Sequence, residues 1–366
     1  MKIGFYSPLP PARTGVADYS AALLRALRRR GEIEIAPRHS DVNLYHLGNN
    51  RIHGPIYERA LRQPGVVVLH DAVLQHFFLG SLTEEQYVEE FAFNYGDWQQ
   101  SLARELWRNR AGSALNAKYF EYPMLKRIAL ASRAVVVHNA AAAERVRAHA
   151  PQARVVEIPH LVEPAEMPDA ADRLRFRARL GIAPGAFLFG VFGYLRESKR
   201  VVAVLRQFEK LHRNMPNTAL LIAGQFVSTD LARAAEPLLR RPGVTRAGHM
   251  NALDFSMAAA SLDACINLRY PSAAETSGIA VRLMGMGKLA MLTRGLENAA
   301  YPETACFRIE SGIAEESALL EHMMVAAAFP QVARDVGRQA ARHIRECHSP
   351  ERVGERYWEA LCLSRG

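Results

Sequence analysis

The residues best suited to ligand chemistry in this sequence lie between Leu268 and Lys288. An apolar run that predicts a β-strand ends at Leu268, and a turn with a single carboxylate, Glu275, leads into a predicted helix. Two hydroxyl residues and a glycine follow that carboxylate: Thr276, Ser277 and Gly278. Because the N–H groups and the dipole at a helix N-terminus attract negative charge, we expect an anion to bind at this turn.

A lysine in a similar position follows an earlier predicted strand, Phe187–Phe192. Lys199 lies six residues after Gly193, and an ammonium held in a dry site stabilises the charge of a departing diphosphate without a metal. Arg196 or Arg200 could supply a second cation. The alternative is a surface lysine at the start of a helix. A carboxylate for sugar hydroxyls and a cation for a diphosphate together suit a sugar nucleotide.

Three segments of the first half end predicted strands with polar residues. His70 and Asp71 follow Val66–Leu69, at the strand end where α/β proteins bind ligands, although His70 could simply be packed and Asp71 could cap a helix. The loop after the first strand has Thr14 as a helix cap and Gly15 as a residue that permits close approach of a ligand or forms a simple turn. The third segment follows the strand at 43–47 and contains Asn49 and His53, and His76 comes further along the chain. Their amide and imidazole groups are candidates for binding an acceptor sugar. An Asx turn explains the asparagines of this segment equally well.

The turn at 271–278, Pro-Ser-Ala-Ala-Glu-Thr-Ser-Gly, resembles the Pro-Ser-x-x-Glu-Gly-Phe-Gly motif of retaining GT-B glycosyltransferases of family 4. The Gly193 to Lys199 spacing also matches that family. The sequence departs from the family at two places: Arg282 and Leu283 stand near the position of its second glutamate, which usually contacts the nucleotide ribose, and Tyr194 replaces an arginine.

The resemblance implies an α/β protein of GT-B architecture, with two Rossmann-like domains facing across a cleft. We expect an acceptor-side domain at residues 1–164, a donor domain at 165–345 and a C-terminal helix at 346–366 that crosses back to the first domain. The implied reaction moves a hexose-like sugar from a nucleoside-diphosphate sugar, UDP- or GDP-linked, to a hydroxyl of a glycan or glycolipid with retention. No cofactor is implied.

The resemblance also implies roles for individual residues. His70, Glu275 and Lys199 would be catalytic, and Asn49, His53 and His76 would bind the acceptor. The donor would be bound by residues of four loops: Gly15, Arg196, Lys199, Glu275, Thr276, Ser277, Gly278, Arg246 and His249. No Asp-x-Asp pair that could hold a metal on the nucleotide sugar is present, so we expect a metal-independent enzyme.

Composition limits the remaining classes. The 366 residues are 49% apolar and 23% charged, as in soluble two-domain proteins, and no apolar run is long enough to span a bilayer. No signal peptide is apparent and the four cysteines are scattered, so we expect a cytoplasmic protein with reduced thiols. The formal charge of +9 is spread along the chain without a nucleic-acid-binding motif, and we expect no nucleic-acid partner.

One basic cluster stands out at the end of the first predicted helix: Arg25, Arg28, Arg29 and Arg30. These cations either complement the helix C-terminus or contact an anionic membrane surface, as would suit a peripheral enzyme with a lipid-linked acceptor.

Two alternative functions remain beside the glycosyltransferase: an inactive sugar-nucleotide-binding protein of the same fold, and a basic membrane-surface or nucleic-acid binder. A GT-B phosphorylase is a third, for which no pyridoxal-phosphate lysine context is present.

Strand-like runs alternate with helical patterns, which favours parallel sheets. The first series of strands is predicted at 3–6, 43–47, 66–69, 134–138 and 155–158, and the second at 187–192, 219–223, 244–246, 263–268 and 289–292. The segment 83–126 breaks the alternation and is predicted to be helical, with aromatic residues that pack rather than bind ligands. Ser349 and Pro350 are predicted to begin a capped terminal helix.

Overall fold

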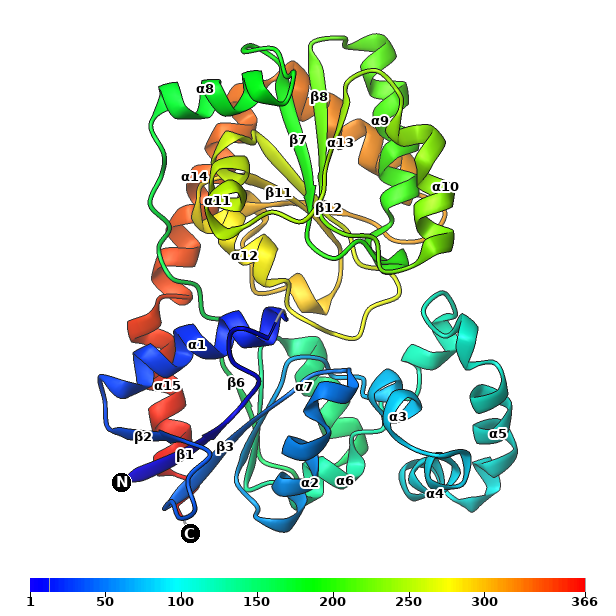
Figure 1. The fold of residues 1–366 in the computed structure, drawn as a ribbon, viewed down its shortest axis with the longest axis vertical. Helices are drawn as coiled ribbons and strands as arrows, with labels where there is room; N and C mark the ends of the chain where they lie inside the picture. Colours follow the sequence, from blue (N-terminus) through cyan, green and yellow to red (C-terminus); the bar gives the residue numbers. More distant parts are fainter. Residues whose placement is uncertain (13, 366) are drawn as a thin grey trace. The chain divides into compact units, whose positions relative to one another are not determined.

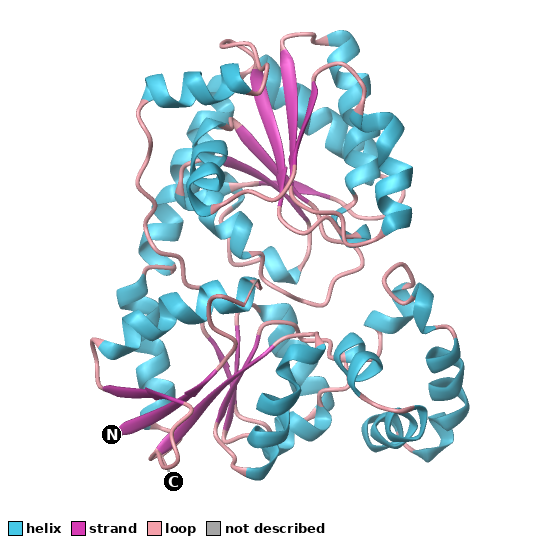
Figure 2. Ribbon diagram, viewed as in Figure 1, coloured by secondary structure: helices cyan, strands magenta, loops and turns pink. Residues whose placement is uncertain are grey.

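A computed structural model describes residues 1–12 and 14–365 (Figure 1). Contacts between residues divide the chain into two compact units. The first unit comprises Met1–Val162, Pro271–Gly278 and Cys347–Gly366, and the second comprises Glu163–Tyr270 and Ile279–Glu346. Each unit holds one sheet with helices around it (Figure 2). Both sheets consist of parallel strands, which confirms the predicted α/β class.

The first unit contains a six-stranded sheet in the order β2-β1-β3-β4-β5-β6. Its strands are β1 (Lys2–Tyr6), β2 (Glu32–Ile35), β3 (Val42–Leu47), β4 (Val66–Leu69), β5 (Ala134–Val137) and β6 (Val155–Glu157). Every residue of the interior strands β4 and β5 is buried, as expected for parallel strands covered on both faces.

The helices of the first unit are α1 (Gly15–Arg28), α2 (Gly54–Arg62), α3 (Gln75–Ser81), α4 (Glu84–Tyr95), α5 (Gln100–Arg108), α6 (Lys126–Ala131), α7 (Ala140–His149) and α15 (Pro350–Cys362). Short 3₁₀ helices occur at η1 (Arg51–His53), η2 (Asp97–Gln99), η3 (Arg110–Gly112) and η4 (Ala117–Phe120). The helical prediction for residues 83–126 is thus confirmed. Most of its aromatic rings pack internally, among them Tyr87 and Phe91, whereas Trp98 is exposed.

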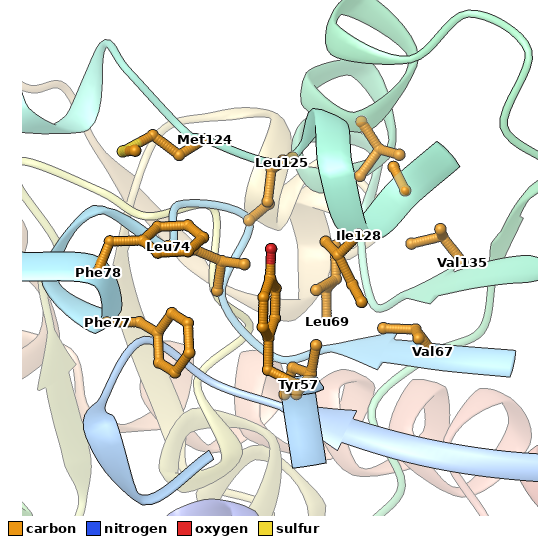
Figure 3. Close-up of a cluster of buried hydrophobic side chains, with 14 of the residues drawn as sticks. Tyr57, Val67, Leu69, Leu74, Phe77, Phe78, Met124, Leu125, Ile128 and Val135 are labelled. Carbon is orange, nitrogen blue, oxygen red and sulfur yellow. The ribbon is translucent and has the colours of Figure 1, made fainter. Parts of the chain in front are cut away.

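One core of the first unit lies between its sheet and the helical segments (Figure 3). Val67 and Leu69 of β4 and Val135 of β5 face Tyr57 of α2 and Ile128 of α6. The core also includes Ala274, which belongs to the segment Pro271–Gly278. That segment was assigned to the second domain from the sequence, and its contacts place it in the first unit.

The second unit contains a six-stranded sheet in the order β12-β11-β10-β7-β8-β9. Its strands are β7 (Phe187–Phe192), β8 (Thr218–Ala223), β9 (Val244–Ala247), β10 (Ala264–Asn267), β11 (Leu289–Thr293) and β12 (Phe307–Ile309). Its helices are α8 (Ala170–Arg179), α9 (Val201–Asn214), α10 (Thr229–Leu239), α11 (Ala252–Ser261), α12 (Gly278–Gly285), α13 (Glu315–Ala328) and α14 (Pro330–Cys347), with 3₁₀ helices η5 (Glu197–Lys199), η6 (Leu296–Asn298) and η7 (Glu303–Ala305).

All ten predicted strands are present within two residues of their predicted bounds. The prediction missed β2 and β12, which are edge strands of the two sheets. Edge strands bury little side-chain area: Glu32, Glu34 and Ile35 of β2 are exposed, so its sequence lacks an apolar run.

The terminal helix α15 begins as predicted, with the Ser349 side chain accepting a hydrogen bond from the N–H of Arg352. It packs on α1 of the same unit, where the Tyr19 and Tyr357 hydroxyl oxygens lie 2.9 Å apart.

The basic cluster contributes to this packing. Arg29 forms an ion pair with Glu351 of 3.1 Å, and Arg30 donates to the Glu351 carbonyl oxygen. Part of the cluster therefore holds α15 in place, and its contact with a membrane stays a prediction. Within the described residues, no helix combines the length and apolar character that crossing a membrane requires.

Candidate functional site

The second sheet has its topological switch point between β7 and β10. The chain runs from β7 to β8 and β9 on one side and returns to place β10 on the other side of β7. In open parallel sheets, ligands bind outside the carboxyl ends of the strands at such a point. The loops that leave β7 and β10 here contain Lys199 and Glu275, the two residues that the sequence singled out.

Lys199 is buried at the carboxyl end of β7, with 6% of its surface exposed. Its ammonium group donates to the carbonyl oxygen of Phe192, the last residue of the strand. Gly193 has a positive φ of 89°, and a Cβ there would lie 3.0 Å from the Lys199 Nζ atom. The glycine thus makes room for the ammonium and permits the left-handed backbone.

The start of α12 lies beside the same glycine. A Cβ at Gly193 would come within 2.4 Å of the side chain of Ile279, in the first turn of α12. The loops after β7 and β10 are also joined directly, because the N–H of Tyr270 donates to the Ser198 carbonyl oxygen at 2.8 Å. A buried cation and the beginning of a helix thus lie close together at the switch point, which suits a diphosphate.

The other cationic residues predicted near the donor differ in their exposure and in the groups that they contact. Arg200 is engaged in an ion pair of 2.6 Å with the buried Glu315, whereas Arg196 is exposed. Arg246 in β9 lies over the ring of Phe226, and His249 is exposed in the loop that follows β9. The roles of Arg196, Arg246 and His249 in donor binding stay predictions.

The turn that contains Glu275 is held by its own hydrogen bonds. The Glu275 carboxylate accepts from the N–H of Ala273 at 2.9 Å, and the Ser272 hydroxyl oxygen accepts from the N–H of Ala274. Ala274 has a positive φ of 56°, an uncommon conformation for a residue with a side chain. The turn therefore has a defined shape that orients the carboxylate.

Asn139 anchors this turn to the first unit, and the sequence analysis did not identify it. Its amide NH₂ donates to the Ala274 carbonyl oxygen and to the Thr276 hydroxyl oxygen, both at 2.9 Å. Its amide oxygen accepts from the N–H of Ala142 and caps α7. The only sequence signal was an asparagine between a strand and a helix, which by itself predicts no more than a cap.

The first sheet has its own switch point, between β1 and β3. Thr14 caps α1 as predicted, accepting from the N–H of Ala17 at 3.1 Å. Gly15 is the first residue of α1, and a Cβ there would meet no atom of the described residues within 4 Å. The helix N-terminus is thus accessible at Gly15, and its contact with a donor stays a prediction.

Asn49 joins the loops that follow β3 and β4. Its N–H donates to the Asp71 carboxylate at 2.8 Å, and its side-chain oxygen accepts from the N–H of Phe77 at 2.9 Å. Its amide nitrogen lies 3.1 Å from Nδ1 of His76. Asn49 and His76 are therefore brought together, with the Asn49 amide engaged in holding α3. Acceptor binding by them stays a prediction.

Four histidines form a row along the carboxyl edge of the first sheet, which we call the histidine row: His46, His70, His138 and His160. They come from β3 and from the ends of β4, β5 and β6, which are neighbours in that order. The ring of Tyr19 lies against all four. Within this row, the sequence analysis assigned a catalytic role only to His70.

Hydrogen bonds fix the tautomers of this row when the rings are neutral. Nδ1 of His138 donates to the Ile158 carbonyl oxygen at 3.0 Å, so its Nε2 accepts from Nδ1 of His70 at 3.3 Å. Nε2 of His70 then accepts from Nδ1 of His46 at 3.0 Å. Both ring nitrogens of His70 are therefore engaged with other histidines.

Burial keeps these rings neutral. It lowers the pKa of His138 to about 4, and it lowers the pKa values of His46, His70 and His160 well below the usual range, with further lowering by neighbouring histidines. His53 is fully buried behind Gly48, donates to the His46 carbonyl oxygen, and has a pKa lowered by burial to about 4. An acceptor-binding role for His53 stays a prediction, and its position is that of a packing residue.

No group of His, Cys, Asp and Glu side chains with the geometry of a metal site occurs among residues 1–12 and 14–365.

No family model and no curated protein sequence matches the chain. Solved structures resemble it over its whole length. Sucrose-phosphate synthase from Thermosynechococcus elongatus superposes with a TM-score of 0.68 at 13% identity, with 98% of each chain covered. HepE from Anabaena, solved in complex with UDP and glucose, gives a TM-score of 0.69 at 14% identity, with 99% of each chain covered.

WaaG, a glycosyltransferase involved in lipopolysaccharide biosynthesis, gives a TM-score of 0.61 at 14% identity, with 99% of each chain covered. At these identities the likeness concerns the fold. It confirms the GT-B architecture that the turn at Glu275 implied.

Proposed function

We propose that the protein is a retaining glycosyltransferase, which moves a hexose-like sugar from a nucleoside-diphosphate sugar to a hydroxyl of a glycan or glycolipid. The observation that carries the proposal is the buried Lys199 ammonium beside the start of α12, at the switch point of the second sheet. Structures of similar fold were solved with UDP or UDP-glucose, which supports a nucleotide sugar as donor.

In the proposed reaction, the bond between the sugar C1 and the diphosphate oxygen breaks, and its electron pair leaves with the diphosphate. Lys199 and the N–H groups at the start of α12 stabilise that charge, so no metal is needed. The acceptor oxygen bonds to C1 on the same face, and its proton passes to a phosphate oxygen of the leaving group. Because both ring nitrogens of His70 are engaged, the phosphate rather than the imidazole takes this proton.

Glu275 has the role of orienting the donor sugar. The N–H of Ala273 holds its carboxylate, and Asn139 fixes the turn from the other side. A carboxylate in a fixed turn accepts hydrogen bonds from sugar hydroxyls in a single orientation. Thr276, Ser277 and Gly278 of the same turn would then contact the donor sugar. Gly15 keeps its proposed role in donor binding and Asn49 its proposed role in acceptor binding.

A transfer assay with a panel of nucleotide sugars tests this proposal. We expect the wild-type protein to release nucleoside diphosphate from one donor series without added metal and to form a product of retained configuration. Glu275→Gln should lower kcat/KM by about tenfold to a hundredfold, because a charge-assisted hydrogen bond to the sugar is weakened. Glu297→Gln, in η6, is a matched control and should change kcat/KM less than twofold.

The alternatives give different results in the same assay. Binding of a donor without transfer or hydrolysis would identify the inactive sugar-nucleotide-binding protein and reject the enzyme. Binding of nucleic acid that weakens steeply with salt, without any donor turnover, would support the basic binder instead.

A further inference from the structure

A second basic site lies in the second unit, at the amino ends of the strands of its sheet, whereas the switch point lies at their carboxyl ends. Leu262 and Asp263 precede β10, and Gly287 and Lys288 precede β11, so these residues mark the amino ends of the strands. Together with α8 and the start of α14 they line a cavity of about 340 Å³ that is open to solvent on one side. Figure 1 shows α8, α11 and α14 grouped on one side of this sheet.

Four cationic side chains line the cavity: Arg173, Arg177, Lys288 and Arg334. Asp263 is the only carboxylate that lines it among the described residues, and it is paired with Arg177 at 2.8 Å. The cavity therefore has a clear excess of positive charge.

Lys288 is the buried member of this group, with 8% of its surface exposed. Its ammonium donates to the carbonyl oxygens of Ala260 and Leu262, at 2.6 and 2.8 Å, which uses two of its three N–H groups. Its pKa is lowered to about 8, mainly by burial; the nearby Asp263 carboxylate opposes this shift, and Arg173 and Arg177 contribute to it. An anion in the cavity would relieve this repulsion between cations.

The four cations differ in how far the fold depends on their hydrogen bonds. Arg177 donates to the Ser261 carbonyl oxygen and, with Lys288, caps the end of α11, so these two are needed for structure. Arg173 donates to the Asp169 carbonyl oxygen, and Arg334 donates to the neutral side chain of Gln331. Neither Arg173 nor Arg334 is needed to close the core, and both bring charge to the cavity.

Two further features suit an anion with an organic part. Pro330 and Ala333 line the cavity, so the N-terminal end of α14 adds its positive dipole there. Ala170, Leu174 and Leu262 form apolar wall, and the volume falls at the lower end of the range for small-molecule sites.

We propose that this cavity binds a small, multiply charged phosphate-bearing ligand, at a site distinct from the proposed donor site. Four cations, the start of a long helix and a cavity of this size supply the charge and the space that such a ligand requires. The proposal does not depend on the proposed function, since it rests on residues at the other edge of the sheet.

Titration calorimetry with inorganic pyrophosphate and the full chain tests the site. The double variant R173Q/R334Q removes the two cations that line the cavity and are not needed for the core. The matched control R175Q/R338Q removes two exposed cations from the same two helices, α8 and α14, so it changes the net charge equally. Neither pair touches Lys199 or α12, so pyrophosphate bound at the switch point contributes equally in both variants.

We expect R173Q/R334Q to weaken one class of pyrophosphate sites at least tenfold, and R175Q/R338Q to change it less than twofold. Equal weakening by the two variants would show a general effect of net charge and overturn the proposal. Absence of pyrophosphate binding to the wild-type protein, or binding that R173Q/R334Q leaves unchanged, would overturn it too.

Discussion

Replacing Lys199 by methionine should lower kcat/KM for sugar transfer by about 10²–10³-fold, the usual cost of removing one preorganised group that stabilises charge. The ammonium lies at the switch point of the second sheet and has 6% of its surface exposed. Burial makes it effective, because water screens it little. Methionine fills the same volume, so the variant should lose the charge without leaving a cavity.

The effect should appear in kcat, because charge develops on the diphosphate as it leaves, and also in KM, because the lysine is proposed to contact the diphosphate of the bound donor. Lys210→Met, in the exposed part of α9, is the matched control and should leave kcat/KM within twofold of the wild-type value. A Lys199→Met protein that is folded, as judged by its circular dichroism and melting transition, and that retains full kcat would remove Lys199 from the mechanism.

Acid should destabilise the protein well before its carboxylates titrate. Burial lowers the pKa of His138 and of His53 to about 4, against about 6.5 in an unfolded chain. Above pH 6.5 these two histidines are neutral in both the folded and the unfolded state, and their contribution to stability is complete. Below pH 6.5 the unfolded chain binds protons that the folded chain excludes, so stability falls with pH until about pH 4, by roughly 3 kcal/mol for each of these histidines.

Denaturant unfolding at a series of pH values measures this loss. His138→Gln keeps a donor for the Ile158 carbonyl oxygen and an acceptor for His70, but it cannot bind a proton, so stability should fall less steeply below pH 6.5. His249→Gln changes an exposed histidine and should leave the slope unaltered. If the stability of the wild-type protein were constant between pH 6.5 and 4.5, the conclusion that burial keeps these histidines neutral in the folded protein would be wrong.

The sequence predicted the layout of the fold because most strands are buried and therefore read as short apolar runs. Phe187–Phe192 is one of them, and all six of its residues are buried. The edge strand β2 escaped this argument because exposure lets it carry charged residues such as Glu32. The edge strand β12 escaped it because it has only three residues, and the charged Arg308 stands between its two apolar ones. The turn at Glu275 and the lysine after Gly193 were found because their spacing matched a known motif.

The histidine row and Asn139 could not be predicted in the same way. His46 and His138 each appear in the sequence as a single polar residue at the end of an apolar run, separated by the whole of α2 to α6. They meet His70 only because β3, β4 and β5 are neighbours in the sheet. Strand order is a long-range property, and no local pattern in one sequence specifies it. The basic cavity beside α8 and α14 depends on long-range packing for the same reason.

Thermal unfolding in the presence of UDP, GDP, ADP and dTDP and their common sugars, without metal, tests the central claim most directly. A ligand at about 100 times its Kd stabilises a fold by about 2.7 kcal/mol, which is readily seen as a rise in Tm. We predict a rise with one nucleotide series, reduced for the sugar form alone by Glu275→Ala and for both forms by Lys199→Met. A Tm that no nucleotide or nucleotide sugar alters would contradict a donor site at this switch point.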